Sequence, residues 1–401
     1  MILNTPYDVA VVGAGPAGST TAGILARKGF KTVLLDRSSE IGIPIHCGEL
    51  LPTLPELHDI FPRSKRLQHL GNIPDIFITN KTTRTQLISP YGHVVEFKFG
   101  TNIIDRTKYD QYLANQASDA GCETHLQSTV VSRSSSNHLE LRSKNGPTHI
   151  DAKIVVGADG PNSIISKTLG NFYSSPDRDL SPAINFIMSG VECEEDVVQM
   201  FFGRNIAPGG YTWIIPKGDS MANVGFGIRR CISNPGTSLL TYLKHFIAKN
   251  KIAAPMMKRA KVVSRVGAII PVAGPVSITF SDNAVLVGDA AGHVMASNGG
   301  GIPTALSGGS IAGNVITAHL EKQTPLSTYE LIWKYEFGKE LDTALSTLRI
   351  ADSVMTSDSL TDVCMKLAGK QFLEPLIRCR LPAPVEFVSK TFVRAFNAVV
   401  N

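Results

Sequence analysis

The first forty residues hold a strand, a glycine loop, a helix and a second strand, an order that leaves few folds open. YDVAVVGAGPAGSTTAGILARKGFKTVLLDR starts with an apolar run typical of a buried parallel strand. Gly13, Gly15 and Gly18 follow as G-x-G-x-x-G, which permits a tight turn, close approach of a pyrophosphate, and close helix–strand packing. Gly29 caps the helix, and Asp36 ends the second strand, where a carboxylate can accept ribose hydroxyls. The pattern predicts a Rossmann-like dinucleotide site.

Two distant segments bear on which dinucleotide binds. Each segment has an apolar strand, a turn with Asp-Gly or Gly-Asp, and the start of a helix. The two segments are IVVGADGPNSIISKTLG (154–170) and NAVLVGDAAGHVMASNGGGIPTALSGG (283–309). A long cofactor that reaches back across the sheet needs both of these segments. Asp289 can orient its hydroxyls, and NGGGI (298–302) can present backbone N–H groups to the edge of a flavin ring. Asp36 fits NAD or FAD better than NADP, although Arg37 beside it weakens that distinction.

Composition excludes several classes of protein. The chain has 401 residues, 43% hydrophobic and 18% charged, and no run approaches the roughly 18 to 20 apolar residues that span a bilayer. A signal-peptide pattern is absent, so we expect a cytoplasmic protein. The net charge of +5 is mild, and its short basic runs lack interleaved aromatics, which predicts no nucleic-acid partner. Six scattered cysteines without zinc-finger spacing predict reduced thiols and no metal site.

The middle and end of the chain predict two further parts. Residues 70–100 and 180–280 alternate apolar and polar positions between Gly and Pro breaks, which predicts an antiparallel sheet with a pocket face towards the flavin. Tyr211 and Trp213 share one face of a strand there, either as core or as a pocket wall. VEFVSKTFVRAFNAVV (385–400) has one apolar stripe, which fits a membrane surface or packing against the protein itself.

We therefore expect an α/β (α+β) fold in three parts. A discontinuous FAD-binding domain covers 1–70, 101–180 and 281–325. The substrate domain on the antiparallel sheet covers 71–100 and 181–280, and a C-terminal helical region covers 326–401.

The nucleotide-binding segments together resemble the flavoprotein superfamily of aromatic hydroxylases (para-hydroxybenzoate hydroxylase-like), flavin halogenases and geranylgeranyl reductases. The matching motifs are the glycine fingerprint, Asp159-Gly160 and Gly288-Asp289. The resemblance implies FAD as the tightly bound cofactor. It also implies that Arg106, in DRTKYDQYLANQASDAGCE, lies at a helix start near the FAD phosphates.

Within this superfamily the chain is most similar to the geranylgeranyl reductase family, particularly the archaeal enzymes that saturate isoprenoid chains of membrane lipids. PIHCGELLP matches a Pro-x-x-Cys-Gly element, and YTWIIPKGDSMANVGFGI (211–228) matches a Tyr-x-Trp pattern that leads to Asn-Val-Gly-x-Gly. GDAAGHVMASNGGGIPTAL has Gly292 where aromatic hydroxylases usually carry His. Ala296 stands where proline is frequent in oxygen-using members, which disfavours monooxygenation.

The resemblance implies an FAD-dependent reductase of geranylgeranyl chains, with an archaeal-type phospholipid as substrate. An isolated alkene does not stabilise hydride addition, so a proton donor is needed, and the candidates are His46, Cys47, Glu49, His293 and an ordered water. Ferredoxin and reduced nicotinamide are both open as electron donors, and peripheral contact with the inner membrane face is likewise left open by the sequence. An oxygen-using monooxygenase or halogenase and a non-catalytic prenyl-binding protein are the alternatives.

IPIHCGELLP (43–52) does not suit a metal pair, because the adjacent His46 and Cys47 side chains diverge. Cys47 is then an active-site residue or a loop thiol. The predicted catalytic residues are Cys47, His46 and Glu49, and the predicted substrate pocket comprises Tyr211, Trp213, Pro216 and Gly225. The predicted cofactor residues are Gly13, Gly15, Pro16, Ala17, Gly18, Asp36, Arg37, Cys47, Gly48, Arg106, Val130, Asp159, Gly160, Gly288, Asp289, Gly300, Gly301 and Ile302.

Overall fold

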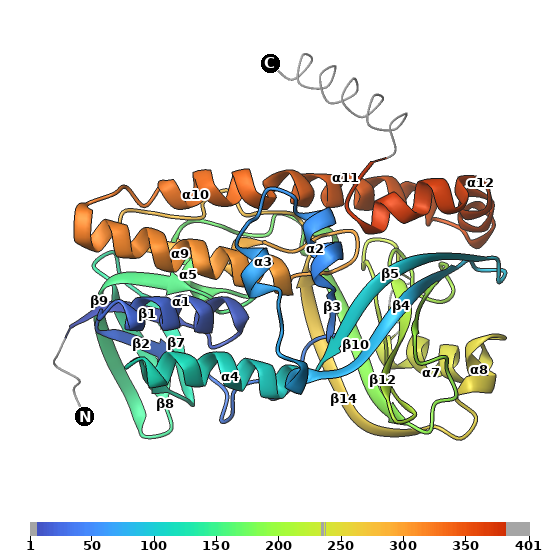
Figure 1. Ribbon diagram of the computed structural model, residues 1–401, viewed down its shortest axis with the longest axis horizontal. Coiled ribbons are helices and arrows are strands. Elements are labelled where there is room, and N and C mark those ends of the chain that lie inside the picture. Colours follow the sequence, from blue (N-terminus) through green and yellow to red (C-terminus); the bar gives the residue numbers. More distant parts are fainter. Residues whose placement is uncertain (1–5, 234–235, 237, 382–401) are drawn as a thin grey trace, which may run out of the picture.

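The computed structural model describes residues 6–233, 236 and 238–381. It is a mixed α/β structure, as predicted, with a nucleotide-binding sheet at one end and a larger sheet at the other (Figure 1). The predicted helix at 385–400 lies outside the described residues. Among those described, the helices are all too short or too polar to cross a bilayer.

The first sheet has seven strands in the order β6-β2-β1-β9-β8-β7, and β15 also pairs with β9. Its parallel part holds the cofactor motifs, while β7 and β8 pair antiparallel with the long β9 to form an arm. The strands are β1 (Tyr7–Val12), β2 (Thr32–Leu35), β6 (Glu123–His125), β7 (Ser128–Arg133), β8 (His138–Ser143), β9 (Gly146–Gly157) and β15 (Ala284–Leu286). The predicted strand–helix–strand order is therefore observed.

Helices α1 (Pro16–Arg27) and α9 (Ile302–Lys322) pack closely together against this sheet. A Cβ at Gly309 would lie 2.4 Å from the Ala17 carbonyl oxygen, and one at Gly313 would lie 2.9 Å from the Ile24 side chain. Only glycine therefore allows the two helices to come this near. Helix α4 (Arg106–Asp119) packs on α1, and the short α5 (Ile164–Thr168) and η2 (Gly288–Ala291) follow β9 and β15.

The second sheet has eight strands in the order β14-β10-β13-β12-β11-β4-β5-β3. Its neighbours pair antiparallel except β4 and β11, which are parallel. Its outer apolar face packs against α7 (Leu239–Lys249) and α8 (Ala253–Met256). The strands are β3 (Leu50–Pro52), β4 (Ile78–Ile88), β5 (Val94–Ile104), β10 (Leu180–Ser189), β11 (Val197–Phe202), β12 (Tyr211–Gly218), β13 (Met221–Gly227) and β14 (Lys261–Pro271).

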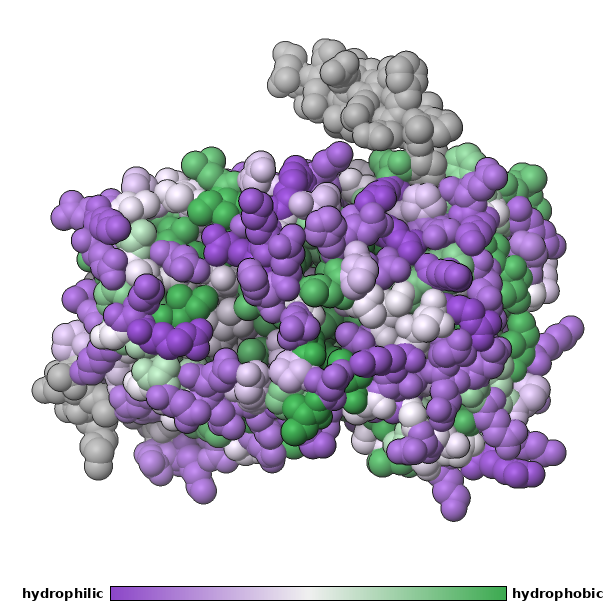
Figure 2. Space-filling view, viewed as in Figure 1, coloured by the Kyte–Doolittle hydropathy of each residue, from purple (hydrophilic) through white to green (hydrophobic). Residues whose placement is uncertain are grey.

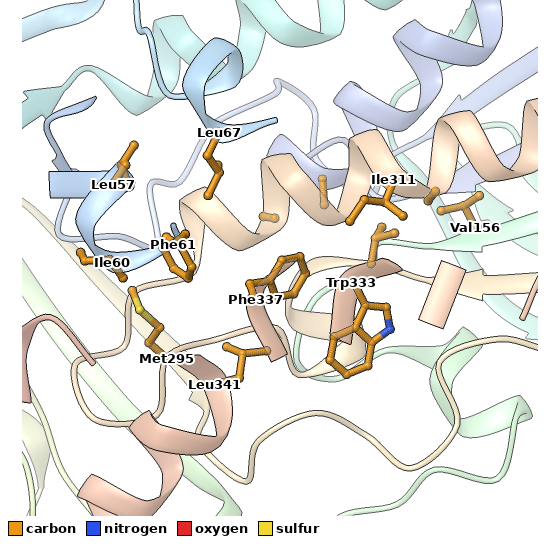
Figure 3. Packing of buried hydrophobic residues seen from close by; sticks show 14 of the residues in the cluster. Leu57, Ile60, Phe61, Leu67, Val156, Met295, Ile311, Trp333, Phe337 and Leu341 are labelled. Carbon is orange, nitrogen blue, oxygen red and sulfur yellow. The ribbon is translucent and has the colours of Figure 1, made fainter. Parts of the chain in front are cut away.

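C-terminal helices cover both halves (Figure 1). They are α10 (Thr328–Trp333), a π-helical turn (Lys334–Gly338), α11 (Lys339–Val354) and α12 (Asp358–Ile377), which is broken at Gly369. Figure 3 shows residues of α2 (Leu54–Ile60) and α3 (Leu67–Leu70) facing Met295, Phe337 and Leu341 in one hydrophobic cluster. The remaining short helices are η1 (Asp75–Phe77) and α6 (Pro176–Asp179).

Candidate functional site

The glycine loop leaves open space at one position only. A Cβ at Gly13 would lie 2.2 Å from the Ala158 carbonyl oxygen, and one at Gly18 would lie 1.9 Å from the Gly13 oxygen, so both glycines are sterically required. A Cβ at Gly15 would meet no atom within 4 Å. Gly15 is the N-cap of α1, whose first turn has no acidic residue. An anion can therefore approach the positive end of this helix, as a pyrophosphate requires.

Asp36 follows β2 and links it to the glycine loop. One carboxylate oxygen accepts the Ala14 N–H at 2.8 Å, and the other accepts the Ser38 N–H at 2.8 Å. Each oxygen has a further lone pair, so the carboxylate can still accept ribose hydroxyls. Arg37 next to it is exposed.

Two other predicted cofactor residues have structural partners. Asp159 caps α5 by accepting from the Ser163 hydroxyl at 2.5 Å and the Ile164 N–H at 2.7 Å. Burial raises the pKa of this carboxyl, and those hydrogen bonds oppose the rise. The side chain of Val130 is buried in the core of the β7–β9 arm, so only its main chain remains to meet a cofactor. For both residues a cofactor role stays a prediction.

Three elements converge around Arg106, the first residue of α4. Its guanidinium donates two bonds of 2.8 Å to the carboxylate of Asp110, and both side chains are largely buried. Burial raises the pKa of the Cys47 thiol, and the positive charge of Arg106 opposes that rise. Burial also raises the pKa of the Asp289 carboxyl, to about 6, and the charge of Arg106 opposes this rise too. Cys47, Arg106 and Asp289 therefore share one electrostatic neighbourhood. Sequence reasoning missed Asp110, although its i, i+4 spacing from Arg106 is typical of a helical ion pair.

The glycine-rich loop after η2 leads into a second free helix N-terminus. Gly301 is the N-cap of α9, and the first turn carries Pro303 and no acidic residue. Gly300 donates its N–H to the Asn298 side chain at 2.9 Å. A Cβ at Gly301 would lie 3.4 Å from an Asp289 carboxylate oxygen. Asp289 and the start of α9 thus face each other, in an arrangement that suits a cofactor with hydroxyls and an anionic edge.

The Cys47 loop lies directly against the aromatic strand β12. The Trp213 indole N–H donates to Asn223 at 2.9 Å, and the Asn223 amide donates to the Cys47 carbonyl at 3.1 Å. A Cβ at Gly48 would lie 3.2 Å from Ile215, and one at Gly225 would lie 2.5 Å from the Trp213 ring. Gly225, predicted as a pocket residue, thereby makes room for the indole.

The other end of β12 reaches the glycine-rich loop. The Tyr211 hydroxyl donates to the Asn298 carbonyl at 2.5 Å, and its ring centroid lies 5.8 Å from that of Trp213. A cavity of about 50 Å³ lies beside both rings, with Ile270, Ala296 and Leu348 in its wall. A larger cavity of about 290 Å³ beside α12 is lined mainly by charged side chains such as Arg378 and Glu374, which does not suit an apolar chain.

The candidate acids differ in surroundings. Glu49 is buried, has a left-handed backbone (φ 64°) and forms an ion pair with Lys217, while its other oxygen has no partner among the described residues. The His46 side chain is exposed, and its Nδ1 lies 2.6 Å from the Gly267 carbonyl. His293 is fully buried among Tyr329, Trp333 and Phe337.

Burial lowers the pKa of His293 to about 3, so this ring stays neutral near pH 7. It is therefore unsuited to donate a proton there. Pro216 is buried on β12, and its carbonyl accepts from the Asn80 side chain at 3.0 Å. Its predicted contact with substrate stays a prediction.

Comparison with known proteins decides the family. Residues 6–45 match a model described as an FAD binding domain, and residues 179–270 match a geranylgeranyl reductase catalytic domain. A digeranylgeranylglycerophospholipid reductase of Methanopyrus kandleri is 33% identical over 376 residues, covering 92% of each chain. The chain belongs to the geranylgeranyl reductase family. FAD is accordingly its cofactor, as predicted.

Solved structures agree with this placement. A geranylgeranyl bacteriochlorophyll reductase-like protein from Thermoplasma acidophilum has a TM-score of 0.80 and 26% identity, covering 96% of this chain and 99% of that one. A flavin-dependent brominase has a TM-score of 0.69 and 16% identity, covering 98% of this chain and 100% of its own. The brominase shows a shared fold alone, so the oxygen-using alternative has less support than the reductase.

Proposed function

We propose that this protein is an FAD-dependent reductase that saturates the carbon–carbon double bonds of geranylgeranyl chains on archaeal-type glycerophospholipids. The observation that carries this proposal is the contact between the Cys47 loop and the wall of Tyr211 and Trp213. The loop shares its electrostatic surroundings with Arg106 and Asp289 and packs against Ile215 and the Trp213 indole. An apolar chain on this wall would lie next to the cofactor. The names of the relatives favour the same substrate.

The residues of the cofactor site have separate tasks in this proposal. Gly15 and the start of α1 receive the pyrophosphate, Asp36 and Asp289 accept hydroxyls, and the N–H groups at the start of α9 stabilise charge on the ring edge. Arg106 supplies positive charge near Asp289. Reduced FAD, when bound, supplies the hydride that adds to one alkene carbon.

The second alkene carbon needs a proton, and we assign its source to Cys47. The Glu49 carboxylate is held by Lys217, and the exposed His46 ring is held by the Gly267 carbonyl. Burial raises the pKa of the Cys47 thiol, so the thiol keeps its proton near neutral pH. The Glu49 N–H points to the Cys47 sulfur at 3.1 Å, and Asn223 holds the Cys47 carbonyl, so the thiol is positioned from both sides.

The substrate must open the pocket as it binds. The cavity beside Tyr211 and Trp213 is about 50 Å³, whereas ligand pockets typically measure roughly 300 to 1,000 Å³. A geranylgeranyl chain therefore displaces side chains of the wall, and Leu348 on α11 and Ile270 on β14 are the apolar ones that line it.

Peripheral membrane contact is part of the proposal. Leu360, Val363 and Leu367 lie at i, i+3 and i+7 on α12 with exposed side chains, and Tyr91 of the β4–β5 turn bonds to Ser359 beside them. In Figure 2, hydrophobic surface borders the end of the molecule where α12 and this turn lie. Such a stripe suits the interface of a lipid bilayer that holds the substrate. Ferredoxin and reduced nicotinamide both remain open as electron donors.

The proposal is tested by anaerobic incubation of the flavin-loaded protein with dithionite and a geranylgeranyl glycerophospholipid. Each saturated bond adds two hydrogens to the lipid, which mass spectrometry detects. Using dithionite removes dependence on the unknown donor. Flavin that stays reduced beside an unchanged lipid would contradict the proposal, and a product that forms only with oxygen would favour the halogenase or hydroxylase alternative.

A further inference from the structure

The antiparallel arm of β7, β8 and β9 presents a polar face that takes no part in the proposed reductase site. It extends from the nucleotide-binding sheet at the lower left of Figure 1. Leu139, Leu141 and Ile150 point into the core. Because side chains alternate along strands, His138 and Glu140 on β8 and His149 and Asp151 on β9 occupy the opposite, outer face.

Strand register brings three of these side chains together. His138 lies directly across from Asp151, and its Nδ1 is 2.8 Å from an Asp151 carboxylate oxygen. His149 lies two residues before Asp151 on the same face, with its ring centroid 4.7 Å from that of His138. One ligating atom from each of the three residues lies within 4.8 Å of the other two. The side chains of His138 and Asp151 are 40% and 53% exposed, so an ion can reach them from solvent.

Two imidazoles and a carboxylate are a ligand set that transition-metal ions prefer. Zinc binds nitrogen and carboxylate oxygen at about 2.0 to 2.2 Å, which places tetrahedral ligands roughly 3.3 Å apart. Side-chain rotations on a paired hairpin can close the remaining gap. Glu140 lies across from His149, and its carboxylate accepts the Ser132 hydroxyl at 2.7 Å. This glutamate, or water, is available as a fourth ligand, whereas calcium and magnesium would need more oxygen atoms.

We propose that His138, His149 and Asp151 form a binding site for a divalent transition-metal ion, for which zinc is the probe. The ion would clamp β8 to β9 on the outer face of the arm, and it would stabilise the folded chain because the unfolded chain does not hold the three ligands together. The site is independent of the reductase reaction. Its residues are separated as His-x10-His-x-Asp, which matches no common metal motif. Only the register of the hairpin assembles them.

The test is equilibrium dialysis of the flavin-loaded protein, freed of any polyhistidine tag, against zinc, followed by metal analysis. Free cysteines contribute zinc binding to every variant, so the difference between variants is the measured quantity. We expect the parent protein to bind one zinc ion more than His149→Ala. Asp151→Asn should bind at least about tenfold more weakly, since loss of even an outer-shell partner costs that much. His245→Ala removes an exposed histidine on α7 and should match the parent protein.

Thermal unfolding with and without zinc gives a second readout. Zinc should raise the melting temperature of the parent protein and of His245→Ala, and it should do so less for His149→Ala and Asp151→Asn. Melting in the absence of zinc checks that each variant folds. If either His149→Ala or Asp151→Asn fails to fold, the comparison of the other variant with the parent protein tests the proposal. Equal zinc content and equal thermal shifts in the parent protein and the folded site variants would overturn the proposal.

Discussion

The Lys217 ammonium and the Glu49 carboxylate form an ion pair that joins the end of β12 to the Cys47 loop. The Glu49 side chain is 1% exposed, and that of Lys217 is 14% exposed. Lys217 follows Ile215 by two residues, at an irregularity in the pairing of β12 with β13 just before the strand ends. Glu49 also has a left-handed backbone, a conformation that costs free energy in a residue with a side chain. The pair therefore holds a strained turn beside the proposed site.

Breaking this pair should destabilise the protein strongly. Lys217→Met leaves the Glu49 carboxylate buried and unpaired, which typically costs about 3 to 5 kcal/mol of unfolding free energy. The double variant Glu49→Gln with Lys217→Met should lose less unfolding free energy than Lys217→Met alone, because it leaves no charge unpaired. Urea unfolding of the flavin-free protein measures both. The control is Lys81→Met, whose pair with Asp75 is exposed and should contribute at most about 1 kcal/mol. Equal losses for Lys217→Met and Lys81→Met would contradict the buried-pair account.

The sequence predicts the local parts of the site well because their signals are local. The spacing of Gly13, Gly15 and Gly18, with a strand before and a helix after, specifies the loop that the structure contains. The alternation of Tyr211 and Trp213 likewise specifies that both rings lie on one face of β12. Each of these features depends on residues within a few positions of one another.

Long-range contacts could not be predicted in the same way. The pairing of Glu49 with Lys217 on β12, and of Asn223 on β13 with the Cys47 loop, brings the segment before β3 against strands from which β3 is separated by β11, β4 and β5 in the sheet. His293 is one of the candidate acids that the sequence offers. Helix α10 and the π-helical turn after it enclose the ring in aromatic side chains instead, and nothing near residue 293 in the sequence indicates that.

Replacement of Cys47 should separate a proton donor from a loop thiol. With Cys47→Ala we expect FAD binding to persist and lipid saturation to fall by about 100-fold or more, within the range that general acids contribute. Cys47→Ser keeps a hydrogen-bonding group of similar size, so its rate of lipid saturation should fall less than that of Cys47→Ala. Single-turnover oxidation of the reduced, flavin-loaded protein by lipid under anaerobic conditions measures the rate. Unchanged turnover and saturation in Cys47→Ala would mean that the thiol is an inert part of the loop.

Arg106 should control the affinity for FAD. Arg106→Ala removes the cation beside Asp289 and also leaves the Asp110 carboxylate unpaired, so Asp110→Asn is combined with it to remove the second effect. A hydrogen bond to a charged group is worth about 1.5 to 3 kcal/mol, so the double variant should bind FAD roughly 10- to 100-fold more weakly. Titration of flavin-free protein, followed by flavin fluorescence, gives the dissociation constant.

The same titration includes Lys108→Ala as a control. Lys108 is on the same helix, but its side chain is 67% exposed and pairs with Asp105. This variant should bind FAD like the parent protein. An unchanged affinity in the Arg106 variant would exclude the arginine from the cofactor site.

The exposed stripe on α12 should govern binding to lipid vesicles. Leu367→Glu places a charge on a side chain that is 81% exposed, so folding should be little affected while insertion into an interface is opposed. Losing the burial of one leucine and adding a charge should weaken binding to anionic vesicles by about tenfold. Co-sedimentation measures the bound fraction. Leu331→Glu changes an exposed apolar residue on α10, outside the stripe and 69% exposed, and this variant should bind vesicles like the parent protein. Equal effects of both substitutions would argue against the stripe.

His293 should make the protein sensitive to acid. Its ring is 0% exposed, and neither nitrogen has a partner among the described residues. The pKa of this histidine is about 3 in the folded protein, against about 6.5 in an unfolded chain. The unfolded state therefore gains a proton first as pH falls below about 6.5, and stability is lost progressively down to about pH 3.

Phenylalanine at this position should remove that loss, because it fits among Trp333 and Phe337 and does not titrate. At pH 5 the shifted pKa of the histidine lowers the free energy of unfolding by about 2 kcal/mol, and at pH 8 this effect is absent. His293→Phe should thus gain stability over the parent protein as pH falls from 8 to 5. Unfolding free energies from urea titrations at the two pH values measure the change. A constant difference between the two proteins across this range would mean that His293 is protonated, or solvated, inside the fold.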